Sequence, residues 1–222
     1  MVDADEWGWI LEHATGGFDH LLLGTSLPVL LGPGMHYAQA WNEAVCSGAW
    51  GARAAGWGEK IRRSQDLDHW SSFHGSFTEL TDLIRAVGAG EKGRPPTSIV
   101  VLSGDVHHCY LAEATFRDEN VESPVYQAVC SPLRNALPSK KSFLQDNAWS
   151  GLAALTSRFL ARLAGIPEEP LTWRMTHDAA FFDNQIATLE LENRSATITF
   201  EKAVLDASKE PALKKLYRHR LA

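Results

Sequence analysis

The chain has 222 residues, 45% of them hydrophobic and 22% charged, which is typical of a globular protein with one sizeable core. Its 21 Lys and Arg against 27 Asp and Glu give a net charge of −6, and no basic stripe indicates a nucleic-acid-binding surface. No apolar run approaches the ~18 residues of a membrane span, and the acidic start MVDADEWGWI lacks the features of a signal peptide, so we expect a cytoplasmic chain.

The first half of the chain predicts helices around one short buried strand. Apolar residues at helical spacing indicate a helix that Asp3 and Asp5 are placed to cap and that Gly16 ends. The other elements expected here are a strand over 21–23, an amphipathic helix over 37–45, and a largely helical stretch over 58–87 with a core stripe of Phe73, Phe77, Leu80, Ile84 and Val87.

The second half predicts mostly strands. Ile99–Leu102 is a continuous apolar run, as expected of a central strand covered on both faces. The other expected elements are strands over 110–116 and 125–130, a helix over 142–164 with a capping box at Ser142 and Gln145 and an apolar stripe of Trp149, Leu152, Phe159, Leu160 and Leu163, and a hairpin over 184–203 that turns at Asn193-Arg194. The basic tail of Lys214, Lys215, Arg218 and Arg220 is interpreted as a solvated helix. The order predicts one domain over 1–222 of mixed class, α/β or α+β, with helices packed on a mixed sheet.

Three residues with metal-binding side chains follow the predicted central strand. The sequence SGDVHH places Asp105, His107 and His108 directly after Gly104, where we expect the backbone to turn sharply. Ligands of sheets with parallel strands tend to bind beyond the carboxyl ends of the strands. A carboxylate with an imidazole suits Zn, Fe, Mn or a two-metal hydrolytic site. The alternative, in which Asp105 caps a turn and the histidines begin a strand, stays open at this point.

The same stretch resembles a known family. VVLSGDVHHCYLAE is similar to the last metal-binding motif of the PhoD-like alkaline phosphatase/phosphodiesterase family, within the metallophosphoesterase superfamily. Further stretches resemble that family in order along nearly the whole chain: MVDADEWGWI, DHLLLGTSLPVLL, HYAQAWNEAVCSGAWG, EKIRRSQDLDHWSSFHGSF, YQAVCSPLRNALP and NQIATLELENRSATITFEKA. The resemblance implies a two-layer β core flanked by helices, a phosphoester substrate, and two divalent or trivalent metal ions (Fe, Zn, Mn or Ca). It further implies that Asp105 and His107, which match the Gly-Asp-x-His motif, are metal ligands and catalytic residues, with His108 a weaker substrate-binding candidate.

The sequence also departs from the family pattern. An aspartate near the start of the domain, an earlier Gly-Asp segment and an Asp-Asp-His-type segment have no counterpart, and Gly104-Asp105 is the only Gly-Asp pair. We therefore expect this chain to correspond to the C-terminal portion of such a domain, with an incomplete metal site and weak or no activity alone. A sheet cut in this way leaves an open edge, so we also expect self-association or a partner that supplies the missing half.

Several other polar residues are candidates for the same site. Ser26 follows the first predicted strand, and Arg134 can bind phosphate as a bidentate donor, although a turn and a structural ion pair explain them as well. The remaining candidates are Asn135, Asp183, Asn184, His36, which is interpreted as a cap or surface residue, and the group Asp66, Asp68 and His69, which is interpreted as lying on a helix with Asp66 and His69 on one face.

Two alternative functions remain beside the metallophosphatase. The first is a non-catalytic truncated remnant or a partner-complemented binding module, which metal content would distinguish from an enzyme. The second is a hydrolase with a Ser-His-Asp arrangement that includes Ser26, which the absence of a Gly-x-Ser-x-Gly elbow disfavours. The three cysteines, Cys46, Cys109 and Cys130, share no CxxC spacing and indicate a reducing compartment without a disulfide framework.

Overall fold

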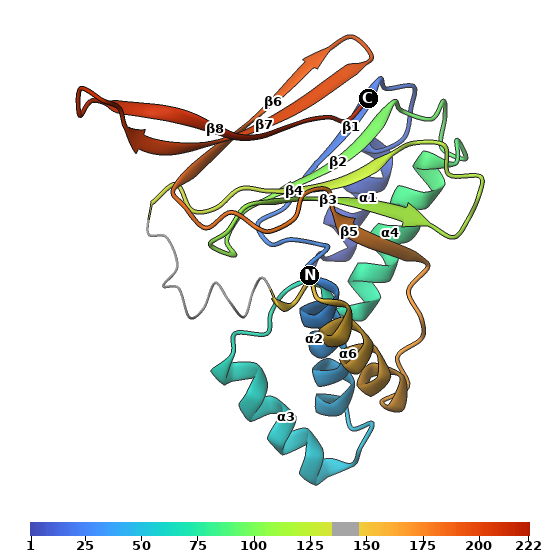
Figure 1. The fold of residues 1–222 in the computed structure, drawn as a ribbon. Helices are drawn as coiled ribbons and strands as arrows, with labels where there is room; N and C mark the ends of the chain where they lie inside the picture. The colour runs from blue at the N-terminus through green and yellow to red at the C-terminus, as the bar shows by residue number, and fades with distance from the viewer. Residues whose placement is uncertain (135–146) are drawn as a thin grey trace.

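Two β-sheets and a set of helices make up the computed structural model, which describes residues 1–134 and 147–222 (Figure 1). The larger sheet has the strand order β1-β2-β4-β3-β5, and the smaller one is the antiparallel sheet β6-β7-β8. The mixed α/β class is therefore confirmed. The strands are β1 (His20–Gly24), β2 (Ser98–Ser103), β3 (Tyr110–Phe116), β4 (Val125–Val129), β5 (Leu171–Met175), β6 (Gln185–Glu192), β7 (Ser195–Leu205) and β8 (Pro211–Arg220).

The larger sheet is covered on both faces, as its apolar strand predicted. β2 pairs in parallel with β1 and β4, and β3 is antiparallel to β4 and β5. Because successive side chains of a strand point to opposite faces, Ile99 and Val101 pack against helices while Val100 packs against β7. All three side chains are buried. β2 thus lies between β1 and β4 in the middle layer of a helix–sheet–sheet sandwich, with helices on one face and the smaller sheet on the other.

The face of the larger sheet opposite β7 packs against α1 (Ala4–His13), the short 3-10 helix η1 (Trp70–Ser72) and α4 (His74–Gly88). The other helices are α2 (Pro33–Cys46), α3 (Ala52–Ser64) and α6 (Gly151–Leu163), and α2 packs against both α3 and α6. α1 begins with the predicted cap, since the Asp3 carboxylate accepts from the backbone N–H of Asp5 and Glu6. α4 buries Phe77, Leu80, Ile84 and Val87, which are four of the five residues of the predicted stripe. Phe73, the fifth, is 39% exposed.

The stretch 58–87 is largely helical, as predicted, but it is divided, because α3 ends at Ser64, Asp66 adopts a left-handed backbone with φ 48°, and α4 begins at His74. One predicted segment has a different secondary structure. The basic tail is not a helix but β8, which pairs with β7 along most of its length. The sequence analysis did not predict β5. The predicted hairpin turn at Asn193-Arg194 is confirmed, because Glu192 pairs with Ser195.

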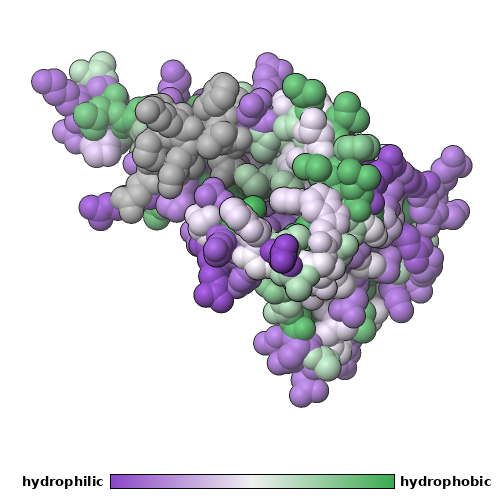
Figure 2. All heavy atoms as spheres, turned by 90° about the horizontal axis from the view of Figure 1, so that it is seen from below, coloured by the Kyte–Doolittle hydropathy of each residue, from purple (hydrophilic) through white to green (hydrophobic). Residues whose placement is uncertain are grey.

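α6 is shorter than predicted and its apolar stripe faces outward. The helix begins after Ser150, whose hydroxyl accepts from the N–H of Ala153, while the predicted cap at Ser142 and Gln145 lies outside the described residues. The stripe was expected in the core, yet it is largely exposed: Leu152 73%, Phe159 61%, Leu160 39% and Leu163 58%. Seen from below, the molecule shows a group of exposed hydrophobic residues (Figure 2, upper right). Only Trp149, just before the helix, packs against the core.

No helix of the described ranges is both long and apolar enough to cross a membrane.

Candidate functional site

The carboxyl ends of the three parallel strands meet at one edge of the larger sheet. Backbone hydrogen bonds hold them there: Thr25 N to Leu102 O at 3.0 Å, Gly104 N to Ser26 O at 3.4 Å, and Cys130 N to Ser103 O at 3.0 Å. This is the position at which sheets with parallel strands bind ligands. The residues that follow β2 therefore lie where a functional site is expected.

Asp105 and His107 are exposed and both have a left-handed backbone, with φ 69° and 58°. Such values are uncommon outside glycine and cost of order 1–3 kcal/mol each, so they persist only where the surroundings impose them. Gly104 is not the special position that we predicted, because its φ is ordinary and an added Cβ would meet Cys130 O at 3.5 Å, a normal contact. The strain lies instead on the two predicted metal ligands.

The loop that carries these two residues is tied to the end of β4. The N–H of His107 donates to the hydroxyl of Ser131 at 3.3 Å, and the N–H of Val106 donates to Gly104 O at 2.9 Å. Val106 is buried between the two exposed residues. Val106 and His108 are buried, and the alternating residues Asp105 and His107 therefore point toward solvent.

His108 is a core residue. It is 2% exposed, and its ring lies between the rings of Tyr110 and Phe182, with centroids 5.3 and 5.4 Å away. Its Nδ1 lies 2.7 Å from Val106 O, which makes Nδ1 the protonated nitrogen. This burial supports a role in fixing the loop rather than in contacting a substrate.

His69 approaches the same edge from the connection between α3 and η1. It does not lie on a helix, and its carboxylate neighbour is Asp68 at 3.6 Å, not Asp66. Burial lowers the pKa of His69, and the charges of Asp68 and Asp105 oppose that shift. The charge of Asp105 therefore reaches His69, a residue 36 positions earlier in the chain.

The tautomer of His69 follows from its partner Gln39. The Gln39 carbonyl accepts from the hydroxyls of Ser71 and Ser72, so its amide must donate to His69 Nδ1, 3.1 Å away. The proton of the neutral ring is then on Nε2, which is buried and has no hydrogen-bond partner among the described residues. His69 thus presents a buried donor, which suits an anionic oxygen better than a metal ion.

Gln127 holds the strand ends together from inside the sheet. This fully buried side chain accepts from the N–H of Val29 and Leu30 at 2.9 and 3.3 Å, and donates to Val101 O and Ser103 Oγ, both at 3.1 Å. Nothing in the sequence marks Gln39, Gln127 or Ser131 as supporting residues, since each acts through tertiary contacts.

The other predicted candidates lie at varied places. Ser26 is exposed beside Gly104, and Arg134 is exposed shortly after the end of β4, whereas Asn135 lies outside the described residues. Asp183 forms an ion pair with Lys202 at 3.1 Å. The interpretation of His36 as a cap or surface residue is wrong, because it is buried in α2 and lies 3.3 Å from Glu169.

The donors of the site suit metal ions, but few of them gather. Asp105 and His107 are the oxygen and nitrogen ligands that Zn, Fe or Mn accept. Within residues 1–134 and 147–222, however, no three His, Cys, Asp or Glu side chains are grouped to hold a metal ion. The described residues therefore fit part of a metal site, not a full set of ligands.

Two cysteines lie directly beneath the loop. The sulfur atoms of Cys109 and Cys130 are 3.5 Å apart. The hydrogen bond between them lowers the pKa of Cys130, and the same contact together with burial raises that of Cys109. The sequence placed these thiols 21 residues apart and gave no indication that they meet.

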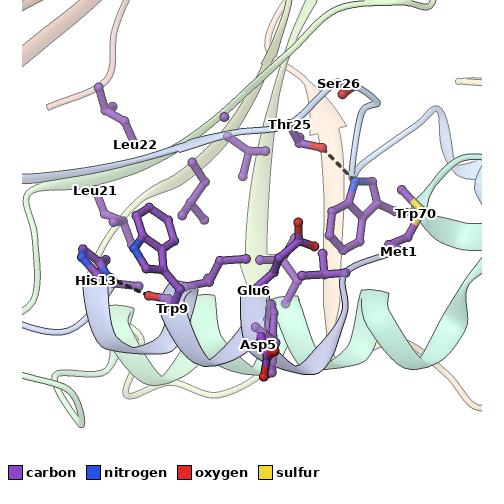
Figure 3. A pocket seen from close by; sticks show the side chains of 18 residues that line it. Met1, Asp5, Glu6, Trp9, His13, Leu21, Leu22, Thr25, Ser26 and Trp70 are labelled. Atoms are coloured by element: carbon purple, nitrogen blue, oxygen red, sulfur yellow. Dashed lines mark hydrogen bonds between the residues drawn. The ribbon is translucent and has the colours of Figure 1, made fainter.

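A separate hollow of about 1040 Å³ lies between α1 and β1 (Figure 3). Ser26 and Trp70 lie at one end of it, where the indole N–H of Trp70 donates to Thr25 Oγ1 at 3.1 Å. Its walls are mostly apolar, and Asp5 and Glu6 add negative charge. These carboxylates would repel a phosphoester.

No family model, curated protein or solved structure matches the chain. The resemblance to the PhoD-like family therefore stays a prediction from the sequence.

Proposed function

We propose that this chain supplies part of the site of a metal-dependent phosphoester hydrolase of the PhoD-like type, a phosphatase or phosphodiesterase. The observation that carries the proposal is the loop after β2, where Asp105 and His107 are exposed and have a left-handed backbone, and where the charge of Asp105 acts on the buried His69. Strain held at a strand end is characteristic of functional sites.

Asp105 and His107 would hold the metal, and His69 would bind the substrate. A bound pair of such ions polarises a phosphoryl oxygen and lowers the pKa of the attacking water. Asp105 contributes carboxylate oxygens and His107 an imidazole nitrogen. The Nε2–H of His69 donates a hydrogen bond to a phosphate oxygen, a role that its neutral form performs near pH 7 because burial lowers its pKa.

The remaining ligands must come from outside the described residues, since two protein ligands rarely hold a divalent ion tightly. Strand β1 is an open edge, paired with β2 alone among the described strands, and it ends at Gly24, two residues before Ser26, which accepts from Gly104 N through its backbone oxygen. A strand added parallel to β1 would lie about 5 Å away and end at the same site. A complementing polypeptide at this edge is thus placed to complete the ligand set.

The second candidate function is a binding module without catalysis. The open edge of β1 and the apolar hollow beside it favour this alternative, because extended peptides bind exposed strand edges through their main chain. A module of this kind requires neither Asp105 nor His107.

Hydrolysis of p-nitrophenyl phosphate and bis(p-nitrophenyl) phosphate, with Zn²⁺, Mn²⁺, Fe²⁺ or Ca²⁺ added, tests the proposal. We expect weak metal-dependent turnover that Asp105→Asn and His107→Ala abolish, while Asp183→Asn, an exposed carboxylate paired with Lys202, leaves it unchanged. Turnover that survives both site variants would refute the assigned ligands. A parent chain with neither turnover nor metal binding would support the binding module.

A further inference from the structure

Cys109 and Cys130 face each other across two antiparallel strands. Tyr110 pairs with Val129, so the preceding Cys109 and the following Cys130 are directly opposite. Cys109 exchanges both backbone hydrogen bonds with Phe181, at 2.8 and 2.9 Å, and Cys130 N donates to Ser103 O on the other side. Each backbone thus turns its polar groups away from the other cysteine.

This arrangement is a non-hydrogen-bonded pair, the narrower of the two kinds in an antiparallel ladder. Such pairs have Cα atoms about 4.5 Å apart, and disulfides span Cα separations of roughly 4.4–6.8 Å. The sulfur atoms are already 3.5 Å apart, and a disulfide needs about 2.05 Å. Side-chain rotation alone can therefore close the bond, without a shift of either strand.

We propose that Cys109 and Cys130 form a reversible disulfide when the protein meets a hydroperoxide, which makes the pair an oxidative modification site beneath the Asp105–His107 loop. Cys130 is the attacking thiol because it is half-buried, whereas Cys109 is fully buried. This inference does not depend on the proposed hydrolase function.

The chemistry balances with the peroxide as the oxidant. The sulfur of Cys130 attacks the outer peroxide oxygen, the O–O bond breaks, an alcohol or water leaves, and Cys130 becomes a sulfenic acid. The sulfur of Cys109 then attacks that of Cys130, the S–O bond breaks, and hydroxide leaves as water with the Cys109 proton. Two thiols lose two electrons in total, and one hydroperoxide gains them.

Oxidation would change how the loop is anchored. The sulfur of Cys109 accepts from Ser131 N at 3.3 Å, while Ser131 Oγ accepts from His107 N at 3.3 Å. The single thiol proton of Cys109 can be donated either to Cys130 Sγ, 3.5 Å away, or to Ser131 O, 3.6 Å away. A disulfide has no thiol proton, so neither of these two hydrogen bonds remains. The disulfide therefore changes the contacts of Ser131, which is the residue that binds the backbone N–H of His107.

Peptide mapping after mild oxidation tests the inference. The native protein is treated with one equivalent of hydrogen peroxide, alkylated with N-ethylmaleimide, and digested with trypsin. Because Arg117 lies between the two cysteines, their peptides separate unless a disulfide joins them. We expect a linked Cys109–Cys130 peptide, 2 Da lighter than its reduced parts, that dithiothreitol releases, while Cys46 stays alkylated.

Two variants give matched controls. Cys46→Ser should leave the linked peptide unchanged, because the link involves only the other two thiols. Cys109→Ser should abolish the link and leave a Cys130 sulfenic acid that dimedone traps. Recovery of Cys109 and Cys130 as fully alkylated peptides from oxidised parent protein would overturn the proposal, as would a link that contains Cys46.

Discussion

Gln127 offers the sharpest test of how the strand ends are held. Substitution of Gln127 by Met keeps the length of the side chain but removes every hydrogen bond that it makes. The backbone N–H groups of Val29 and Leu30, residues that are 1% and 3% exposed, then lose their acceptor. Val101 O and Ser103 Oγ lose a donor in the same change.

The expected loss in the free energy of unfolding follows from the two buried N–H groups, of Val29 and Leu30, that are left without an acceptor. A buried donor left without a partner costs about 1–3 kcal/mol, so two of them cost roughly 2–6 kcal/mol. A midpoint of about 4 kcal/mol corresponds to a loss of roughly 8–16 °C in Tm for a chain of this size. This is a large share of the ~5–15 kcal/mol by which domains are stable.

Urea unfolding followed by circular dichroism measures this cost directly. Gln65→Met is the matched control, because Gln65 is exposed and the hydrogen bond that its side chain makes within the described ranges is a long one to Ser64 Oγ, at 3.5 Å. We expect the control to unfold within about 0.5 kcal/mol of the parent, as surface substitutions usually do. A Gln127→Met protein that loses less than about 1 kcal/mol relative to the control would refute the role given to Gln127.

Two further predictions concern pH and association. Burial lowers the pKa of His36, which lies inside α2, so the unfolded chain takes up a proton below pH ~6.5 that the folded chain does not. The free energy of unfolding should therefore fall between pH 6.5 and 5.5, by up to ~1 kcal/mol from His36 alone, and urea titrations that show equal or higher stability at pH 5.5 would contradict this. Because the open edge from Leu21 to Gly24 carries neither proline nor charge and Leu22 is 40% exposed, we expect concentration-dependent self-association in sedimentation velocity that Leu22→Lys weakens and Leu205→Lys, at an exposed strand end, does not. A parent chain that stays monomeric at every concentration would contradict self-association through the exposed edge of β1.

The sequence predicts those elements whose hydrophobic pattern is local and regular. Ile99–Leu102 was correctly expected to be a central strand, and the hairpin turn at Asn193 was correctly placed. The prediction of a helix for the basic tail was wrong for a physical reason. The pairing of β7 with β8 shifts between Phe200 and Glu201, so Leu216 of β8 has no partner in β7. That extra residue breaks the two-residue alternation, so the tail has no strand pattern.

The residues of the candidate site likewise fall into those with a local signal in the sequence and those brought together only by the fold. Asp105 and His107 directly follow a recognisable strand, so the sequence alone is enough to propose them as ligands. His69 was singled out but assigned to a helix, and the charge of Asp105 acts on it only in the folded chain, where the next residue, Trp70, donates to Thr25 after the end of β1. The contact of Cys109 with Cys130 likewise exists only through the pairing of β3 with β4. Long-range pairing of this kind leaves no signal in a single sequence.

Calorimetric titration of the purified chain with Zn²⁺ and Mn²⁺ measures the metal binding that the proposed hydrolase site requires. We expect weak binding by the parent chain, in keeping with its partial ligand set, that both Asp105→Asn and His107→Ala abolish, and binding by Asp183→Asn equal to that of the parent, with all proteins equally folded by circular dichroism. Equal binding by the parent and both site variants, or none by any of them, would contradict the assignment of Asp105 and His107 as metal ligands.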